Sequence, residues 1–137
     1  MKSAFKVRET APRDYEGVKR LLIETGMVGK FPKATFSRIL DRNRRYCLVA
    51  AAKGKVVGSV FGFDDVLTLH ISKLAVDESY RRQGVGRLIM KELMRRSKKP
   101  GFDYIFLHVR KKNKGAVALY RSLGFKYRNM VFHFMDI

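Results

Sequence analysis

Three apolar segments follow one another in the middle of the chain and are separated only by short polar connections. Tyr46 to Ala52 is followed by Lys53-Gly54, then by Lys55 to Phe63, and, after Asp64-Asp65, by Leu67 to Val76. A glycine in a two-residue connection supplies the positive φ that a hairpin turn needs. We therefore expect three consecutive antiparallel strands at the centre of a sheet.

Helical and extended patterns surround these strands. Apolar residues recur at helical spacing after Pro12, around Ala34 to Asp41, from Gly84 to Ser97 and from about Lys114 to Leu123. The remaining apolar segments, Phe5 to Glu9, Tyr104 to Val109 and Phe125 to Ile137, predict strands, the last as one or two. The order β-α-α-β-β-β-α-β-α-β predicts an α/β fold with a mixed, mostly antiparallel sheet and helices packed on it. The length of 137 residues fits a single domain spanning residues 1–137.

The composition excludes several classes of protein. With 46% hydrophobic residues the chain can form a core, so it is not a disordered basic tail. The apolar run from Cys47 to Ala52 is far shorter than the ~20 residues of a membrane-spanning helix, and residues 1–9 lack the apolar stretch of a secretory signal. Cys47 is the only cysteine, and the three histidines are scattered, so we expect neither a disulfide nor a metal site. A cytoplasmic location follows.

Positive charge is concentrated in one part of the chain. The whole sequence has 30 Lys and Arg against 12 Asp and Glu, a net charge of +18. Residues 81–128 hold 15 of these cations and only Glu92 and Asp103 as acids. This excess predicts an anionic partner, which is a nucleic acid, a membrane surface or a phosphorylated small molecule.

A glycine-rich junction between a strand and a helix predicts a phosphate site. Leu69 to Val76 is followed by a short acidic turn and then by Arg81-Arg82-Gln83-Gly84-Val85-Gly86-Arg87. Glycines allow the backbone to approach a ligand, and the free N–H groups of a first helical turn bind phosphate. The three arginines add charge-assisted contacts, so a diphosphate fits better than a single phosphate.

Two motifs in the expected order resemble the GNAT family of N-acetyltransferases. Arg81-x-x-Gly84-x-Gly86 after an apolar strand looks like the pyrophosphate loop of that family, whose cosubstrate is acetyl-CoA. Downstream, Asn113, Ala116, Leu119-Tyr120 and Gly124-Phe125 match its N-x-x-A-x-x-L-Y-x-x-x-G-F signature. The resemblance covers about residues 46–128. It implies a sheet whose strands Leu69–Val76 and Tyr104–Val109 splay apart at the cofactor cleft.

The resemblance also implies roles for individual residues. Main-chain groups near Leu74, Ala75 and Val76 would pair with the pantetheine arm, as an added strand does. The diphosphate would bind Arg81, Arg82, Gly84, Val85, Gly86 and Arg87, and Asn113 would contact the cofactor or cap the helix that follows. Tyr120 would donate a proton to the departing CoA thiolate, although a tyrosine on an apolar helix face is also a common core residue.

Two histidines are candidates for the base. A primary amine is protonated near neutral pH, so a group must take its proton before it attacks the thioester. His70 and His108 lie at corresponding positions of two neighbouring expected strands, and an imidazole titrates near the working pH. Their surroundings, LHISKLAV and LHVRKKN, resemble the branch that acetylates protein N-terminal α-amines. Each histidine could equally be a half-buried structural residue. The short segment after Phe125 leaves little room for the hairpin that covers the substrate in that branch.

The sequence leaves three functions open. The first is acetyl-CoA-dependent acetylation of a primary amine on a protein or peptide, either an N-terminus or a lysine. The second is acetylation of a small-molecule amine. The third is a non-catalytic module that binds RNA or another polyanion through its basic surface, and association with RNA or the ribosome is compatible with the first function as well.

Overall fold

A computed structural model describes residues 5–137, so the first four residues of the segment considered for a secretory signal lie outside it. Five strands form one sheet in the order β1-β2-β3-β4-β5. Neighbouring strands are antiparallel except β4 and β5, which are parallel. The strands are β1 (Lys6–Glu9), β2 (Leu48–Ala52), β3 (Lys55–Asp64), β4 (Thr68–Val76) and β5 (Tyr104–Leu107). The predicted mixed, mostly antiparallel sheet is therefore confirmed.

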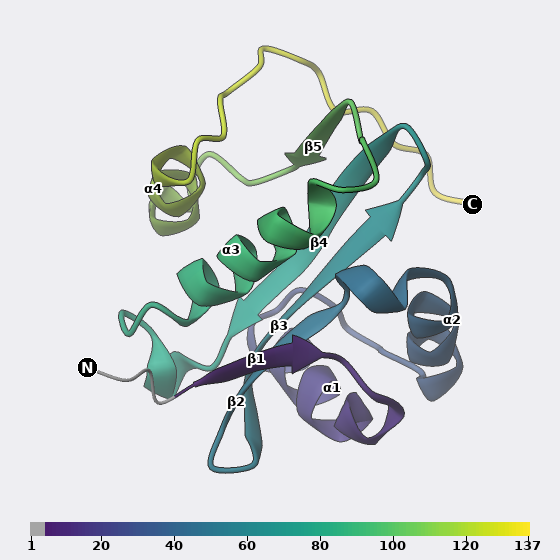
Figure 1. Ribbon diagram of the computed structural model, residues 1–137, viewed down its shortest axis with the longest axis vertical. Helices are drawn as coiled ribbons and strands as arrows, with labels where there is room; N and C mark the ends of the chain where they lie inside the picture. The colour runs from purple at the N-terminus through teal and green to yellow at the C-terminus, as the bar shows by residue number, and fades with distance from the viewer. Residues whose placement is uncertain (1–4) are drawn as a thin grey trace.

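Helices cover both faces of this sheet (Figure 1). The four α-helices are α1 (Tyr15–Glu24), α2 (Lys33–Asn43), α3 (Val85–Ser97) and α4 (Lys114–Ser122), and three short 3₁₀ turns are η1 (Pro12–Asp14), η2 (Arg44–Tyr46) and η3 (Glu78–Tyr80). Each predicted helix is present within a few residues of its expected bounds. The Lys53-Gly54 connection has φ values of 51° and 77°, as the expected hairpin turn requires.

Each face of the sheet has its own apolar core. Ile89, Met90 and Leu93 of α3 pack against one face, where they meet side chains such as Leu48 and Val57. On the other face, α1 and α2 supply the buried residues Leu21, Leu22 and Phe36, which pack with Val49 and Phe61. This apolar stripe on each helix explains why the sequence forms two helical layers around one sheet.

The predicted strand or strands at Phe125 to Ile137 are wrong. This segment has no regular secondary structure and, in Figure 1, leaves α4, passes over β5 and ends beyond the β3–β4 hairpin. Met130, Val131 and Phe134 are each at least 78% exposed. Their β propensity suggested a strand, but a strand also needs a hydrogen-bonding partner, which propensity does not supply.

Candidate functional site

Strands β4 and β5 separate halfway along β4. They pair only from Thr68 to Ile71, opposite Tyr104 to Leu107. Beyond Ile71, β4 continues to Val76, while the chain after Leu107 leaves the sheet. Among residues 5–137, the edge of β4 that faces away from β3 therefore has no neighbouring strand at the predicted pantetheine-binding residues, which are Leu74, Ala75 and Val76.

A β-bulge lies at the point of separation. On β3, Ser59 is opposite Ala75 and Phe61 is opposite Ser72, so one residue of β3 faces two of β4. Lys73, one of those two, has a φ of 60°. A bulge of this kind bends a strand and increases its local twist. The bulge thus accounts for the change in direction that opens a gap between β4 and β5.

The connection from β4 to α3 is held at its base by Asp77. The Asp77 carboxylate accepts a hydrogen bond from the Ser79 backbone N–H at 2.9 Å, which lowers the pKa of Asp77, and from Arg20 at 3.0 Å. Further along, Arg82 and Gly84 have φ values of 63° and 81°. Two left-handed residues turn the chain sharply into α3, whose N-cap is Gly84.

The first turn of α3 presents the groups that a phosphate needs. The first helical hydrogen bond joins the Leu88 N–H to the Gly84 carbonyl at 3.0 Å, so the N–H groups of Val85, Gly86 and Arg87 precede any intrahelical acceptor. A Cβ atom at Gly86 would lie 3.4 Å from Leu119 Cδ2 and 3.8 Å from a side-chain carbon of each of two β4 residues, Leu74 and Val76. Glycine therefore keeps open a narrow space between β4 and α4.

The three predicted arginines differ in their surroundings. Arg81 and Arg82 are exposed, and their side chains make no ion pair or hydrogen bond to any residue that the structure describes. Arg87 donates a hydrogen bond to Ser122 Oγ, which links α3 to α4. A hollow of about 380 Å³ opens beside this link, and its wall includes Lys91, Arg95 and Lys98. Positive side chains thus follow one side of α3 from its first turn to its C-cap.

Asn113 caps α4, and Tyr120 lies on that helix. The Asn113 side chain accepts a hydrogen bond from the Ala116 N–H at 3.1 Å and so caps this helix. The Tyr120 ring packs edge-to-face on Phe125, with 5.8 Å between ring centroids. Burial raises the pKa of Tyr120, and its hydroxyl has no hydrogen-bond partner among residues 5–137. The phenol is therefore protonated near neutral pH and available to another acceptor.

The structure brings His70 and His108 together. Their rings lie 5.7 Å apart, centroid to centroid, at an angle of 82°. The His70 ring is also stacked on Phe106 at 4.7 Å, and His108 contacts Phe132 at 4.8 Å. Burial is the main cause that lowers the pKa of His70, the nearby His108 and Lys73 lower it further, and Asp65 offsets part of this effect. His70 is therefore mainly neutral at pH 7 and able to accept a proton.

Phe106 is a member of this site that sequence reasoning missed. The parallel register places Phe106 opposite His70, and its ring contacts both histidines. Phe63, on the other side of His70, continues the same row of rings at 6.1 Å. The spacing of Phe106 two residues before His108 could have indicated this position, because alternate strand residues share a face.

Other candidate chemistries find no support in the described part of the chain. Burial raises the pKa of Cys47 to about 12, so this thiol does not ionise near neutral pH. Among residues 5–137, no three His, Cys, Asp or Glu side chains gather in a way that could hold a metal ion. None of the described helices combines the length and the apolar character that crossing a membrane requires.

Comparisons with known proteins agree with this architecture. Residues 11–125 match the model of the Acetyltransferase (GNAT) family. The chain is 30% identical over 117 residues to an N-alpha-acetyltransferase of Sulfurisphaera tokodaii, which covers 76% of this chain and 70% of that protein. The crystal structure of Ard1 from Thermoplasma volcanium has a TM-score of 0.81 and 28% identity, and it covers 90% of this chain and 83% of that one.

A further relative matches over a shorter region. The chain is 46% identical over 52 residues to the [Ribosomal protein bS18]-alanine N-acetyltransferase of Escherichia coli (strain K12). This match spans 38% of the chain and only 35% of the length of that enzyme. The family match nevertheless includes most of the chain, so this protein belongs to the GNAT family, as the two sequence motifs indicated.

Proposed function

We propose that the protein is an acetyltransferase that moves the acetyl group of acetyl-CoA to the α-amine of a protein or peptide. The observation that carries this proposal is the separation of β4 from β5, with a helix N-terminus on one side and the histidine pair on the other. An open strand edge next to free N–H groups suits a long cosubstrate that ends in a diphosphate. The name of the Sulfurisphaera relative, an N-alpha-acetyltransferase, supports the choice of acceptor.

The residues of the cleft suit each part of acetyl-CoA. Its diphosphate would bind the N–H groups at the start of α3 together with Arg81 and Arg82, and the hollow beside Arg87 offers further cations for the remaining phosphate. The pantetheine arm would lie along β4 at Leu74, Ala75 and Val76. The narrow space at Gly86 supports this fit, because a side chain there would fill the gap between β4 and α4. Asn113, which caps α4, would lie beside the cosubstrate.

Acetyl-CoA supplies an activated thioester, so no nucleophile of the protein is needed. His70, aided by His108, takes the proton of the acceptor ammonium, which leaves an amine with a free lone pair. The amine nitrogen bonds to the acetyl carbon, and the bond from that carbon to sulfur breaks. Tyr120 gives its proton to the departing sulfur. The nitrogen then loses its second proton to solvent, His70 releases its proton to solvent, and the Tyr120 phenolate takes one proton back, so that one proton is released for each acetyl group transferred.

The acceptor end of the site favours a peptide. The His70 ring lies between Phe63 and Phe106, and His108 and Phe132 extend this cluster of rings. Such a surface suits contact with peptide side chains next to the reacting amine. A lysine side chain or a small amine remains an alternative acceptor. The lone buried thiol of Cys47 supports a cytoplasmic location for this activity, because a reducing compartment keeps thiols free.

The test is a kinetic comparison of acceptors with acetyl-CoA. The panel contains peptides with a free N-terminus, the same peptides with a blocked N-terminus and one internal lysine, and a polyamine. We expect acetylation of the free α-amines with a kcat/KM at least tenfold above that of the other acceptors. Faster acetylation of the polyamine would assign the protein to small molecules, and no turnover of any acceptor would overturn the proposal.

A further inference from the structure

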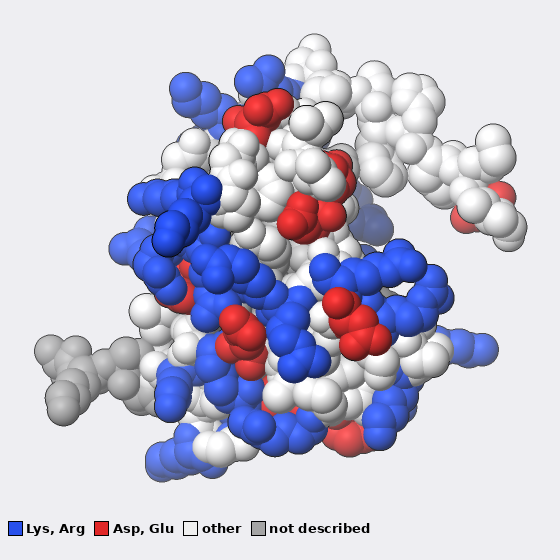
Figure 2. Space-filling view, turned by 45° about the vertical axis from the view of Figure 1, so that its right-hand side comes forward, with Lys and Arg blue, Asp and Glu red and all other residues white. Residues whose placement is uncertain are grey.

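Most of the described Lys and Arg side chains form no ion pair with another described residue. Of the 29 described Lys and Arg residues, only five form ion pairs, which are Arg8, Arg20, Lys55, Arg95 and Arg96. An internal network of salt bridges therefore does not explain the excess. Figure 2 shows that Lys and Arg cover much of the middle and lower part of one face, whereas the region around the C-terminal segment is nearly free of them.

Part of this charge lies along the edge strand β1, far from the histidine pair in the sheet order. We call the exposed cations Lys6, Arg13, Arg44, Arg45 and Lys53 the β1 strip. None of them forms an ion pair with another described residue. Lys6 lies on β1, Arg13 on η1, Arg44 and Arg45 on η2, and Lys53 in the turn that follows β2.

Specific contacts bring these elements together. The Thr10 N–H donates to the Cys47 carbonyl at 2.8 Å and thereby joins the end of β1 to the end of η2. Arg96 of α3 donates to the Arg45 carbonyl at 3.1 Å and pairs with Glu9 at the end of β1. The charges of the strip are thus on adjoining elements, although they are far apart in the sequence.

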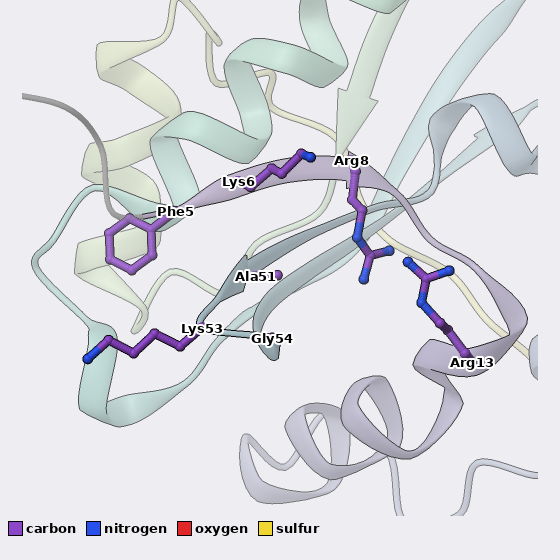
Figure 3. Close-up of a pocket in the computed structure, with 7 residues that line it drawn as sticks. All are labelled: Phe5, Lys6, Arg8, Arg13, Ala51, Lys53 and Gly54. Carbon is purple, nitrogen blue, oxygen red and sulfur yellow. The ribbon is translucent and has the colours of Figure 1, made fainter.

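The middle of the strip is concave. A hollow of about 490 Å³ is lined by Lys6, Arg8, Arg13 and Lys53 together with Phe5, Ala51 and Gly54. Figure 3 shows the guanidinium groups of Arg8 and Arg13 pointing toward one another across it. Arg8 is held by two hydrogen bonds to Asp14, at 2.8 and 2.9 Å, whereas Arg13 forms no ion pair or side-chain hydrogen bond with any of residues 5–137 and acts on Asp14 only through its charge. Four cations and one carboxylate leave a net charge of +3 around this hollow.

We propose that the β1 strip binds the phosphate backbone of RNA. Guanidinium and ammonium groups spread over a groove match successive phosphates, and such contacts carry no base specificity. The large apolar side chains that stand exposed among residues 5–137 lie elsewhere, from Ile23 of α1 to the C-terminal segment, and Phe5, which lines the hollow, is half-buried; this part of the chain therefore gives the strip no exposed apolar side chain to insert into a membrane. The choice of RNA rests on the proposed function, because protein N-termini first become available at the RNA-rich ribosome. The binding itself does not depend on acetyl transfer.

The experiment measures fluorescence anisotropy of a short labelled RNA hairpin between about 50 and 200 mM salt. The test variant is Lys6→Gln/Arg13→Gln/Lys53→Gln, which leaves Arg8 and its bond to Asp14 intact. The control, Arg121→Gln/Lys126→Gln/Arg128→Gln, removes the same charge from α4 and the segment after it. Each phosphate contact contributes roughly 0.7 to 0.9 to the salt slope, so three lost contacts should reduce the slope by about 2 to 3. We expect this reduction in the test variant only, with unchanged acetylation of a peptide.

Several results would overturn the proposal. They are an equal loss of RNA binding in the control, loss of RNA binding at saturating CoA, and binding to anionic phosphatidylserine vesicles without binding to RNA. A protein that acetylates peptides but does not bind RNA would refute this inference alone. Conversely, RNA binding with the expected slopes but no acetyl transfer would refute the proposed function and leave the strip as an RNA site.

Discussion

Replacing Gly58 with alanine tests how closely α3 must approach the sheet. A Cβ atom at this position of β3 would lie 2.8 Å from both Ile89 Cδ1 and Val85 Cγ1. Ile89 and Val85 are 0% and 1% exposed, so neither can move toward solvent without disturbing the core. Overpacking of this kind costs about 1–3 kcal/mol. We expect the unfolding free energy of Gly58→Ala to fall by roughly this amount.

The same substitution should weaken cosubstrate binding. Val85 is the first residue of α3 and lies between Gly84 and Gly86, so relief of the clash would displace the start of the helix. A loss of about 1.4 kcal/mol corresponds to a tenfold higher Kd, which we expect for CoA in titration calorimetry. The control is Gly29→Ala, where an added Cβ meets nothing within 4 Å and the backbone is not left-handed. Urea unfolding should change by less than about 0.5 kcal/mol there. A Gly58→Ala protein as stable as this control, or one that binds CoA normally, would refute the reasoning.

Three further predictions concern single side chains. Tyr120→Phe should lower kcat for acetyl transfer at least tenfold with little change in the Kd for CoA, and an unchanged kcat would remove Tyr120 from the mechanism. Because burial lowers the pKa of His70, kcat/KM should fall with decreasing pH only below the usual imidazole value of about 6.5. The pH profile of His70→Gln should lack this acidic decrease. If the variant keeps the decrease, His70 is not the base. Hydrogen bonds from Arg95 and Arg96 lower the pKa of Glu92 to about 2. The ion pairs of Glu92 therefore stabilise the fold fully above its unfolded pKa of about 4.5, and this stabilisation is lost as the pH falls toward 2. Chemical unfolding should show Glu92→Gln to be less stable than the natural protein at pH 7 and equally stable near pH 2, and an equal difference at both pH values would contradict this.

The sequence predicted the sheet well because most of its strands have local signals. The glycine turn at Lys53-Gly54 and the continuous apolar runs on both sides define β2 and β3 without knowledge of the fold. The final segment differs, since the run from Met130 to Met135 has the composition of a strand but no partner in the structure. Composition reports the preference of a segment, whereas pairing depends on what lies beside it.

The candidate site was predictable only in part. The glycine loop was visible in the sequence from its motif spacing, and His70 from its place on an apolar strand. The expected strand Tyr104–Val109 ends at Leu107, so His108 follows β5 instead of lying on it, and His70 is opposite Phe106. The β-bulge at Lys73 was not visible, since it depends on the register between β3 and β4. The position of Phe106 beside both histidines depends likewise on the parallel pairing of β4 with β5, which joins residues far apart in the sequence.

The basic surface shows the same distinction between local and long-range information. The charge of residues 81–128 is evident from the sequence, but the β1 strip is assembled from residues 6 to 53 by the contacts of β1, η1 and η2. Arg8 and Arg96 lie close to the strip but form ion pairs, and this distinguishes them from the unpaired cations of the strip. A count of charges along the chain does not distinguish a paired arginine from a free one.

The most direct test of the central claim uses one peptide that has both a free N-terminus and an internal lysine. The protein is incubated with this peptide and acetyl-CoA, and tandem mass spectrometry locates the acetyl group. We predict a single acetyl group on the α-amine, formed much more slowly by the double variant His70→Gln/His108→Gln. An acetyl group on the lysine side chain, or an equal rate in the double variant, would contradict the account.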